Sequence, residues 1–405
     1  MRAYERLIKY TKFETASDDR SKTYPSTASQ LEFGRALVEE MKSIGIEDAN
    51  IDQYGYVTGT IPSNIATKCP VIGFIAHMDT VGDTEYKNVK TRLIENYDGS
   101  DICVDGKPYL SEANLPVLKE LHGKTLLVTD GTTLLGADDK AGIAEIMTFA
   151  EKLINDPSIK HGDIRIAFTP DEEIGRGVDY FDVPAFKAEY AYTLDGSAFG
   201  EVEYETFNGA TAEITIHGIS THTGTAKNKM KNAILIAGEF LCSLPEDERP
   251  ETTEGYEGFY HANNVSGTVE LAKIRYNLRD HDKSILDKRK QTVQELIDKL
   301  NEKYGEGTVE GNIYDTYYNM REKIEEHMHL IEIASDAVRQ LGGTVMMNPV
   351  RGGTDGCKLS FMGLPCPNLG TGSYYPHGKF EFSCVEDMDK AVELMVLISK
   401  AFAER

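Results

Sequence analysis

Cysteine and long apolar segments are both scarce in this chain, and each shortage excludes a class of protein. The 405 residues include 6 cysteines and no C-x-x-C pair, which is too few for a disulfide-stapled scaffold and fits a reducing compartment. No run approaches the roughly 20 apolar residues of a membrane span. The N-terminus mixes charged and apolar residues instead of forming the apolar core of a signal peptide. We therefore expect a cytoplasmic protein without a membrane partner.

Positive charge is also in short supply. Lys and Arg number 43 against 66 Asp and Glu, which gives a formal net charge of -23. Such a field repels polyphosphate backbones and anionic surfaces, so no nucleic-acid partner is expected. With 40% hydrophobic and 27% charged residues the composition is that of a globular protein. The length favours two domains over one.

Short apolar runs alternate with helical patterns through most of the chain. The expected strands are 71–76, 125–129, 164–168 and 190–194, and the expected helices are 31–44, 143–154, 330–341 and 387–402. This alternation predicts an α/β domain with a mostly parallel mixed sheet flanked by helices. We expect this domain to be discontinuous, comprising residues 1–207 and 318–405.

The pattern changes between these two segments. Strands are expected at 211–217, 258–268, 270–279 and 307–314, and helices at 233–244 and 293–300. The order β-α-β-β-α-β is that of a split βαβ unit. We expect an inserted α+β domain over residues 208–317.

Histidine and acidic residues follow each of the four predicted strands of the first domain. In chain order they are His77 and Asp79, Asp138 and Asp139, Asp171, Glu172 and Glu173, and Asp195. Ligands bind outside the carboxyl ends of strands in an open α/β sheet, so these side chains should share one crevice, where His377 could supply a second imidazole. Such a set suits Zn²⁺, Mn²⁺ or Co²⁺, and a carboxylate could bridge two ions.

Each of these acids alone has an ordinary explanation as a turn or cap residue, but five segments of the same kind favour a metal site. Asp79 stands two residues from His77, where it could hydrogen-bond the ligand imidazole. Glu172, beside Glu173, is the free carboxylate best placed to take a proton from water.

Several multi-residue motifs resemble the M20 family of dizinc metallopeptidases. They are Ala76-His-Met-Asp-Thr80, Leu134-Leu-Gly-Ala-Asp-Asp-Lys-Ala-Gly142, Thr169-Pro-Asp-Glu-Glu-Ile-Gly175 and Thr193-Leu-Asp-Gly196. More narrowly, segments 253–261, 317–321, 351–356 and 362–368 are similar to the aminotripeptidase branch of that family. The resemblance implies a catalytic domain with two Zn²⁺ per subunit, Co²⁺ or Mn²⁺ being substitutes, and an inserted lid.

The resemblance also assigns roles at the metal centre. It implies one zinc on His77 and Asp195, the other on Glu173 and His377, with Asp138 rather than Asp139 as the bridge. It further implies Glu172 as the general base, Asp79 as the carboxylate that orients His77, and a non-proline cis peptide after Asp138.

The implied reaction is hydrolysis of the first peptide bond of a tripeptide by zinc-activated water. His222 matches a family histidine that reaches the reacting carbonyl, although Thr223 follows it where relatives often carry proline. Arg279 and Arg351 are our candidates for pairing with the free C-terminal carboxylate of the substrate. The alternative for each is a structural ion pair with a neighbouring acid such as Asp280 or Asp355.

Other functions are left open. Another M20 peptidase, such as a dipeptidase, carboxypeptidase or aminoacylase, would share the metal ligands. A non-catalytic metal-binding relative would be expected to have lost Glu172 or a ligand, and none is missing. A dehydrogenase would need G-x-G-x-x-G between a strand and its helix, where this chain has acidic residues instead. A serine hydrolase of the α/β type is unsupported, because no G-x-S-x-G occurs. The sequence decides neither between monomer and homodimer nor whether His222 acts in its own or a partner's site.

Overall fold

The computed structural model describes residues 1–104 and 106–405, and the chain divides into two compact units. The first comprises Met1–Tyr204, Glu322–Met347 and Thr354–Arg405, and the second comprises Glu205–Arg321 and Asn348–Gly353. The sequence-based boundaries at 207/208 and 317/318 lie within a few residues of two of these divisions. No sequence pattern indicated that Asn348–Gly353 belongs to the second unit.

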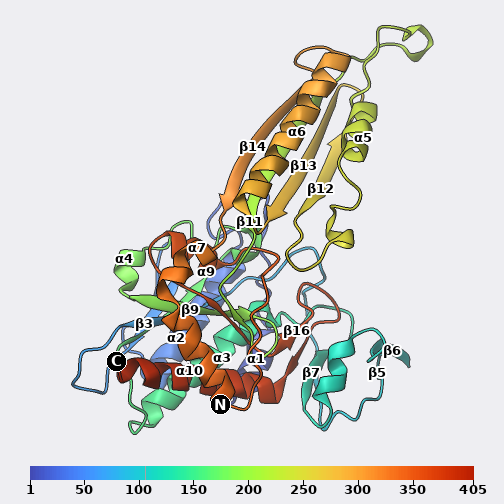
Figure 1. Cartoon of the computed structure of the whole chain (residues 1–405). Helices are drawn as coiled ribbons and strands as arrows, with labels where there is room; N and C mark the ends of the chain where they lie inside the picture. Colours follow the sequence, from blue (N-terminus) through green and yellow to red (C-terminus); the bar gives the residue numbers. More distant parts are fainter. Residues whose placement is uncertain (105) are drawn as a thin grey trace. The chain divides into compact units, whose positions relative to one another are not determined.

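A seven-stranded mixed sheet forms the centre of the first unit (Figure 1). In spatial order its strands are β1 (Asn50–Ile51), β2 (Val57–Ile61), β8 (Ile164–Thr169), β3 (Ile72–His77), β9 (Tyr190–Gly196), β15 (Asn368–Gly370) and β10 (Val202–Glu203). The four strands from β8 to β15 run parallel, and the outer strands are antiparallel. Every residue of β3 is buried, as expected for a parallel strand with both sheet faces covered. The predicted α/β class is confirmed.

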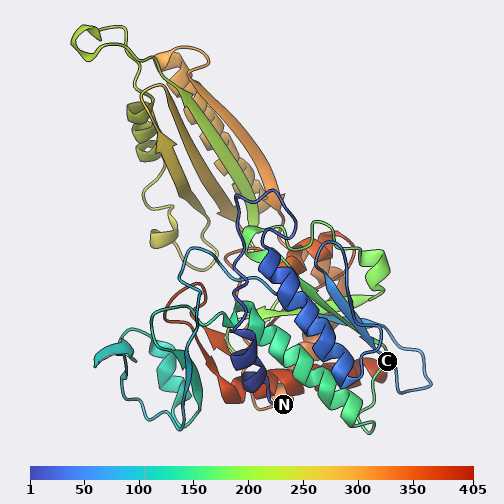
Figure 2. The same ribbon diagram turned by 180° about the vertical axis from the view of Figure 1, so that it is seen from behind.

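Helices cover both faces of this sheet. In chain order the unit contains α1 (Ala3–Tyr10), α2 (Ala28–Ile44), α3 (Ala137–Asn155), α4 (Val183–Phe186), α8 (His329–Gln340), α9 (Asp355–Phe361) and α10 (Val385–Ala403), and α7 (Arg321–Ile324) begins at the boundary. Helices α2 and α3 lie on one face (Figure 2), and α8 lies on the other (Figure 1). Helix α2 ends at Gly45, whose φ of 107° is a left-handed conformation that favours glycine.

One expectation about this unit is wrong. The predicted strand 125–129 forms β7 (Leu126–Thr129), which lies outside the seven-stranded sheet, in a separate sheet of order β16-β17-β7-β4. The other members are β4 (Thr91–Ile94), β16 (Ser373–Tyr374) and β17 (Phe382–Cys384), and a hairpin of β5 (Ile102–Val104) and β6 (Lys107–Leu110) is nearby in sequence. Because β7 is buried in its own small core, its apolar run predicts burial but not the sheet to which it belongs.

The second unit has the predicted β-α-β-β-α-β order. Its elements are β11 (Asn208–His217), α5 (Ala233–Ser243), β12 (Phe259–Gly267), β13 (Leu271–Asp280), α6 (Lys283–Tyr304) and β14 (Val309–Tyr317). The antiparallel sheet has the order β12-β13-β11-β14, and both helices pack on one face of it (Figures 1 and 2). Buried and exposed residues alternate along β13 because only this face is covered.

Among the described residues, no helix has both the length and the apolar character needed to span a bilayer.

Candidate metal centre and catalytic residues

The first group of possible metal ligands forms where two parallel strands end side by side. His77 is the last residue of β3, and Asp195 lies near the end of the adjacent β9. The Nε2 atom of His77 lies 2.9 Å from Oδ1 of Asp138 and 3.4 Å from Oδ1 of Asp195. Its Nδ1 atom lies 3.0 Å from the carbonyl oxygen of Asp79. A proton on Nδ1 would bond that carbonyl and leave the Nε2 lone pair directed at the two carboxylates.

A second group shares Asp138 with the first. The Nε2 atom of His377 lies 3.0 Å from Oδ2 of Asp138 and 3.0 Å from Oε2 of Glu173. Asp138 therefore directs one carboxylate oxygen to each group, which is the arrangement of a bridging ligand. The other oxygen of Glu173, Oε1, is buried and has no hydrogen-bond partner among the described residues. Both groups bring their ligand atoms within 4.8 Å of one another.

The electrostatics of this cluster favour positive charge. Burial raises the pKa of Glu173 to about 8, and burial likewise raises the pKa of Asp195 to about 6. Burial would lower the pKa of His377, but its hydrogen bonds to Asp138 and Glu173 raise it to about 11. Two imidazoles and three carboxylates at this spacing match the N and O donor sets of borderline divalent ions.

The Asp138–Asp139 peptide bond is cis, and the two aspartates have different roles. Asp139 is buried, and its carboxylate accepts backbone N–H groups from His77 at 3.1 Å and Gly142 at 3.2 Å. Asp139 thus holds the end of β3 against the start of α3, whereas Asp138 faces both ligand groups.

Glu381 also positions Asp138, and the sequence interpretation missed it. Its buried carboxylate accepts the backbone N–H groups of Leu135, Gly136 and Asp138 at 2.7, 2.7 and 3.0 Å. Burial raises the pKa of Glu381 to about 7. A usable signal existed, because Glu381 follows His377 by four residues in the same short loop.

Asp79 supports the loop that carries Glu172 and Glu173. Its carboxylate oxygens accept the backbone N–H groups of these two residues at 2.9 and 3.1 Å. The same carboxylate lies 3.4 Å from Nδ1 of His77, so it faces both His77 and the Glu172 loop. Burial raises the pKa of Glu172 well above its ordinary value.

A buried network fixes the same loop from the other side. Asp171 is fully buried with a left-handed φ of 56°. Its carboxylate accepts the backbone N–H of Ser26 at 2.7 Å, the Ser26 hydroxyl at 2.5 Å and the Gln30 amide at 2.7 Å. The Gln30 side-chain oxygen in turn accepts the Asp171 backbone N–H at 3.0 Å. Sequence reasoning missed this network because Ser26 and Gln30 lie about 140 residues away.

The two candidate arginines belong to the second unit. Arg279 donates from Nη1 to the carbonyls of Ala210 and Leu278 at 3.0 and 2.9 Å, and the alternative partner Asp280 pairs with Arg289 instead.

Arg351 also makes contacts within the second unit. It donates to the carbonyls of Gly255 and Glu257 at 2.9 and 2.7 Å and to the Thr253 hydroxyl at 2.7 Å. Asp355, its alternative partner, accepts a hydrogen bond from the Thr169 hydroxyl at 2.7 Å. Arg351 thus holds the loop before β12.

His222 lies in an exposed loop after β11. Its Nδ1 atom accepts the backbone N–H of Gly224 at 3.2 Å. Arg279 is paired with Gly209 at one end of β11, whereas His217 ends the strand eight residues further on. At about 3.3 Å per residue, Arg279 and the start of the His222 loop are roughly 26 Å apart.

The paired ligand groups at the ends of parallel strands, on a fold shared with solved peptidases, define a metallopeptidase of the M20 type. A tripeptidase from Staphylococcus aureus superposes with a TM-score of 0.77 at 21% identity, covering 100% of this chain and 98% of that one. A dinuclear metal-binding peptidase of the M20 family from Bacillus subtilis superposes with a TM-score of 0.63 at 15% identity, with 99% and 98% coverage. Residues 204–308 match the family described as a peptidase dimerisation domain.

A closer relative in sequence narrows the class. Peptidase T of Caldanaerobacter subterraneus subsp. tengcongensis is 54% identical over 403 residues, which cover 99% of this chain and 98% of that protein. This chain therefore belongs to the peptidase T family. The resemblance to an M20 metallopeptidase inferred from the motifs is confirmed, and so is the prediction of an enzyme.

Proposed function

We propose that this enzyme removes the N-terminal residue from tripeptides in a reaction that depends on two divalent metal ions. The observation that carries the proposal is the pair of ligand groups sharing Asp138, with the carboxyl group of Glu172 beside them, in a chain of the peptidase T family. The S. aureus neighbour, named a tripeptidase, supports the substrate class.

The residues fit a pair of zinc ions. We assign His77 and Asp195 to one ion, Glu173 and His377 to the other, and Asp138 to both. The unpartnered oxygen of Glu173 and the direct contacts between imidazoles and carboxylates support this assignment. Co²⁺ and Mn²⁺ have the same preference for N and O ligands and are expected to substitute.

When bound, such a pair of ions polarises the scissile carbonyl and lowers the pKa of water. Glu172 takes the proton from the attacking water and then gives it to the leaving amine. Asp79 keeps Glu172 in place through the Glu172 backbone N–H.

Substrate length is measured at the free C-terminal carboxylate. Arg279 and Arg351 are the proposed partners of this group, because a guanidinium pairs with a carboxylate through two parallel hydrogen bonds. Arg351 already uses donors to hold the loop at Thr253–Glu257, so its substitution should also loosen that loop. Arg279 is the simpler position to test.

His222 acts in the site of a partner copy. An extended tripeptide is at most about 11 Å long, much less than the roughly 26 Å that separate the His222 loop from Arg279 in one sheet. The match to a peptidase dimerisation domain favours a homodimer. So do the exposed apolar side chains Leu235 of α5 and Val265 of the edge strand β12, 71% and 56% exposed.

Subunit complementation tests the shared site. Protomers carrying His222→Ala are mixed with protomers carrying Glu172→Ala, each nearly inactive alone. If His222 serves the partner, random mixing restores about a quarter of wild-type activity, because half of the dimers have one intact site. If His222 serves its own chain, mixing restores nothing.

The substrate class is tested with dialanine, trialanine, tetra-alanine and N-acetyl-trialanine, using zinc-loaded protein and mass identification of products. We expect cleavage of free trialanine alone, into alanine and dialanine, with loss of activity in Glu172→Ala. Efficient cleavage of dialanine or the acetylated peptide would assign the enzyme another M20 specificity. No turnover with both metals bound would favour a non-catalytic metal-binding protein.

A further inference from the structure

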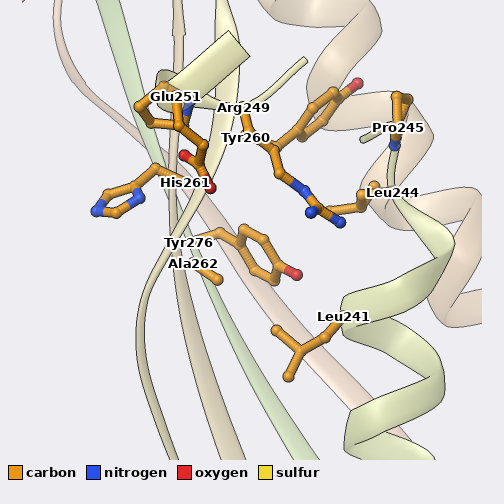
Figure 3. A pocket seen from close by; sticks show the side chains of 10 residues that line it. Leu241, Leu244, Pro245, Arg249, Glu251, Tyr260, His261, Ala262 and Tyr276 are labelled. Atoms are coloured by element: carbon orange, nitrogen blue, oxygen red, sulfur yellow. The ribbon is translucent and has the colours of Figure 1, made fainter. Parts of the chain in front are cut away.

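A pocket of about 280 Å³ lies within the second unit, between the end of α5 and the beginning of β12 (Figure 3). Its walls include Leu241 and Leu244 near the end of α5, the loop through Arg249 and Glu251, and Tyr276 of β13. The volume is near the lower limit of the about 300–1,000 Å³ typical of small-molecule sites. Its size suits a molecule as small as a single amino acid. All the candidate metal ligands belong to the first unit, so this pocket is a separate site.

Two opposite charges line the pocket without neutralising each other. The guanidinium of Arg249 and the carboxylate of Glu251 both extend into the space shown in Figure 3. No ion pair of either side chain occurs within residues 1–104 and 106–405. Two unpaired opposite charges in one pocket are complementary to a ligand that carries both charges.

The hydroxyl group of Tyr276 faces the same space. Tyr276 is only 3% exposed, and its hydroxyl is directed toward Arg249 (Figure 3). This hydroxyl has no hydrogen-bond partner among the described residues, and it is not one of their buried unpartnered atoms, so it keeps access to solvent. Burial raises the pKa of Tyr276 to about 12, so the hydroxyl remains a donor at neutral pH. A ligand oxygen beside Arg249 would satisfy it.

We propose that this pocket binds the zwitterion of an apolar α-amino acid. The ligand carboxylate pairs with Arg249 and accepts the Tyr276 hydroxyl, the ammonium group pairs with Glu251, and the side chain packs against Leu241 and Leu244. A simple carboxylate would leave Glu251 without a counter-charge, and a simple amine would leave Arg249 without one. The inference does not depend on the proposed reaction, because no candidate catalytic residue lines the pocket.

Crystals of the full-length, metal-loaded protein soaked in L-selenomethionine give a direct test. The selenium atom should produce an anomalous peak between Leu241 and Leu244 in the wild-type protein and no peak there in Arg249→Met. A peak confined to the metal centre, or no peak at the pocket, would overturn the proposal.

Calorimetric titration gives a second test that does not require crystals. L-leucine should bind Arg249→Met and Tyr276→Phe at least about tenfold more weakly than wild type, since each change removes a partner of the carboxylate. Arg275→Met is the matched control, because Arg275 is the exposed neighbour of Tyr276 on β13, and it should bind normally. L-leucinamide and N-acetyl-L-leucine each lack one charge and should also bind at least about tenfold more weakly. Equal binding of L-leucine to wild type and Arg249→Met, or of N-acetyl-L-leucine and L-leucine to wild type, would contradict the zwitterion site.

Discussion

The loop that carries Glu172 and the loop that carries His222 are held in different ways. The first is fixed by the fully buried Asp171, by Gln30 and by the carboxylate of Asp79. The second is exposed, and the His222 ring accepts a hydrogen bond from the backbone N–H of Gly224, two residues away in the same loop. The Glu172 loop is thus held by a network that joins distant segments of the chain, whereas the His222 ring makes a contact within its own turn.

This difference matches what each loop is proposed to do. A general base beside two metal ligands must stand in a fixed geometry before substrate arrives, so its supports are built into the fold. A histidine that enters another copy's site can take its final position from that copy. Buried polar contacts therefore hold the Glu172 loop, where several metal ligands must keep a fixed geometry. The His222 loop has no such buried contacts among the described residues.

The largest expected effect is that of Glu172→Gln. Loss of the general base should lower kcat/KM for trialanine by about 10³-fold, within the range known for acid–base groups. Bound metal, measured by elemental mass spectrometry, should be unchanged because Glu172 belongs to neither ligand group. Glu302→Gln, at an exposed position of α6, is the control and should be fully active. Retention of a tenth of wild-type activity in Glu172→Gln would argue against its role as base.

His222→Ala tests the other side of the comparison. We expect about a 10²-fold loss of kcat from the missing contact to the reacting carbonyl. Because the residue is exposed, metal content and the melting temperature should remain within error of wild type. Thr223→Ala provides a control in the same loop. A melting temperature lowered by several degrees would mean that His222 has a structural role instead.

Gln30→Leu disrupts the buried network around Asp171, which supports the loop that carries Glu172. It removes two hydrogen bonds to the buried Asp171, which should cost about 1–3 kcal/mol of stability and about tenfold in kcat, with KM little changed. Gln291→Leu is the matched control, because Gln291 bonds Glu295 on an exposed helix. If the variant were destabilised but kept wild-type kcat, the network would serve folding alone.

Most of the fold could be predicted from the sequence because hydrophobic period and burial agree in most elements. The split βαβ order of the second unit follows from alternation such as that of Thr211–His217. The kinked start of α3 could not be predicted, since Asp138 and Asp139 within its bounds have non-helical φ and ψ ahead of the apolar stripe that starts at Ile143. The placement of β7 in the smaller sheet could not be predicted either. An apolar run indicates a buried strand but does not show which strands pair with it.

The candidate site likewise contains residues that could be predicted from the sequence and residues that could not. His77, Asp138, Glu173, Asp195 and His377 stand out because metal-binding residue types follow strands or lie in recognisable motifs. Their supports do not, since any polar side chain can hold a backbone N–H group and only the fold brings it there. Glu381 and Gln30 are such supports.

The smallest expected effect is on stability and comes from replacing Glu145. Glu145 can be compared with Asp171, because both carboxyl groups are buried. It is fully buried like Asp171, but neither of its oxygens has a partner among the described residues. Burial raises its pKa well above the ordinary value, so the folded protein keeps a proton that the unfolded chain loses above about pH 4. The penalty from Glu145 is therefore absent in acid and grows as the pH rises.

Replacing this side chain with an apolar one of similar size should remove the penalty. Glu145→Met should stabilise the protein by about 1–3 kcal/mol near pH 8, and the gain should shrink toward pH 4, as measured by melting temperature at constant metal saturation. Glu151→Met on the same helix is the matched control, because Glu151 pairs with Arg6 and with the N-terminal amine, and its loss should be mildly destabilising. A gain at Glu145 that is independent of pH would show that its pKa is the same in the folded protein and the unfolded chain, against the burial argument. A loss of stability would show that a partner satisfies this carboxyl group as Gln30 satisfies Asp171.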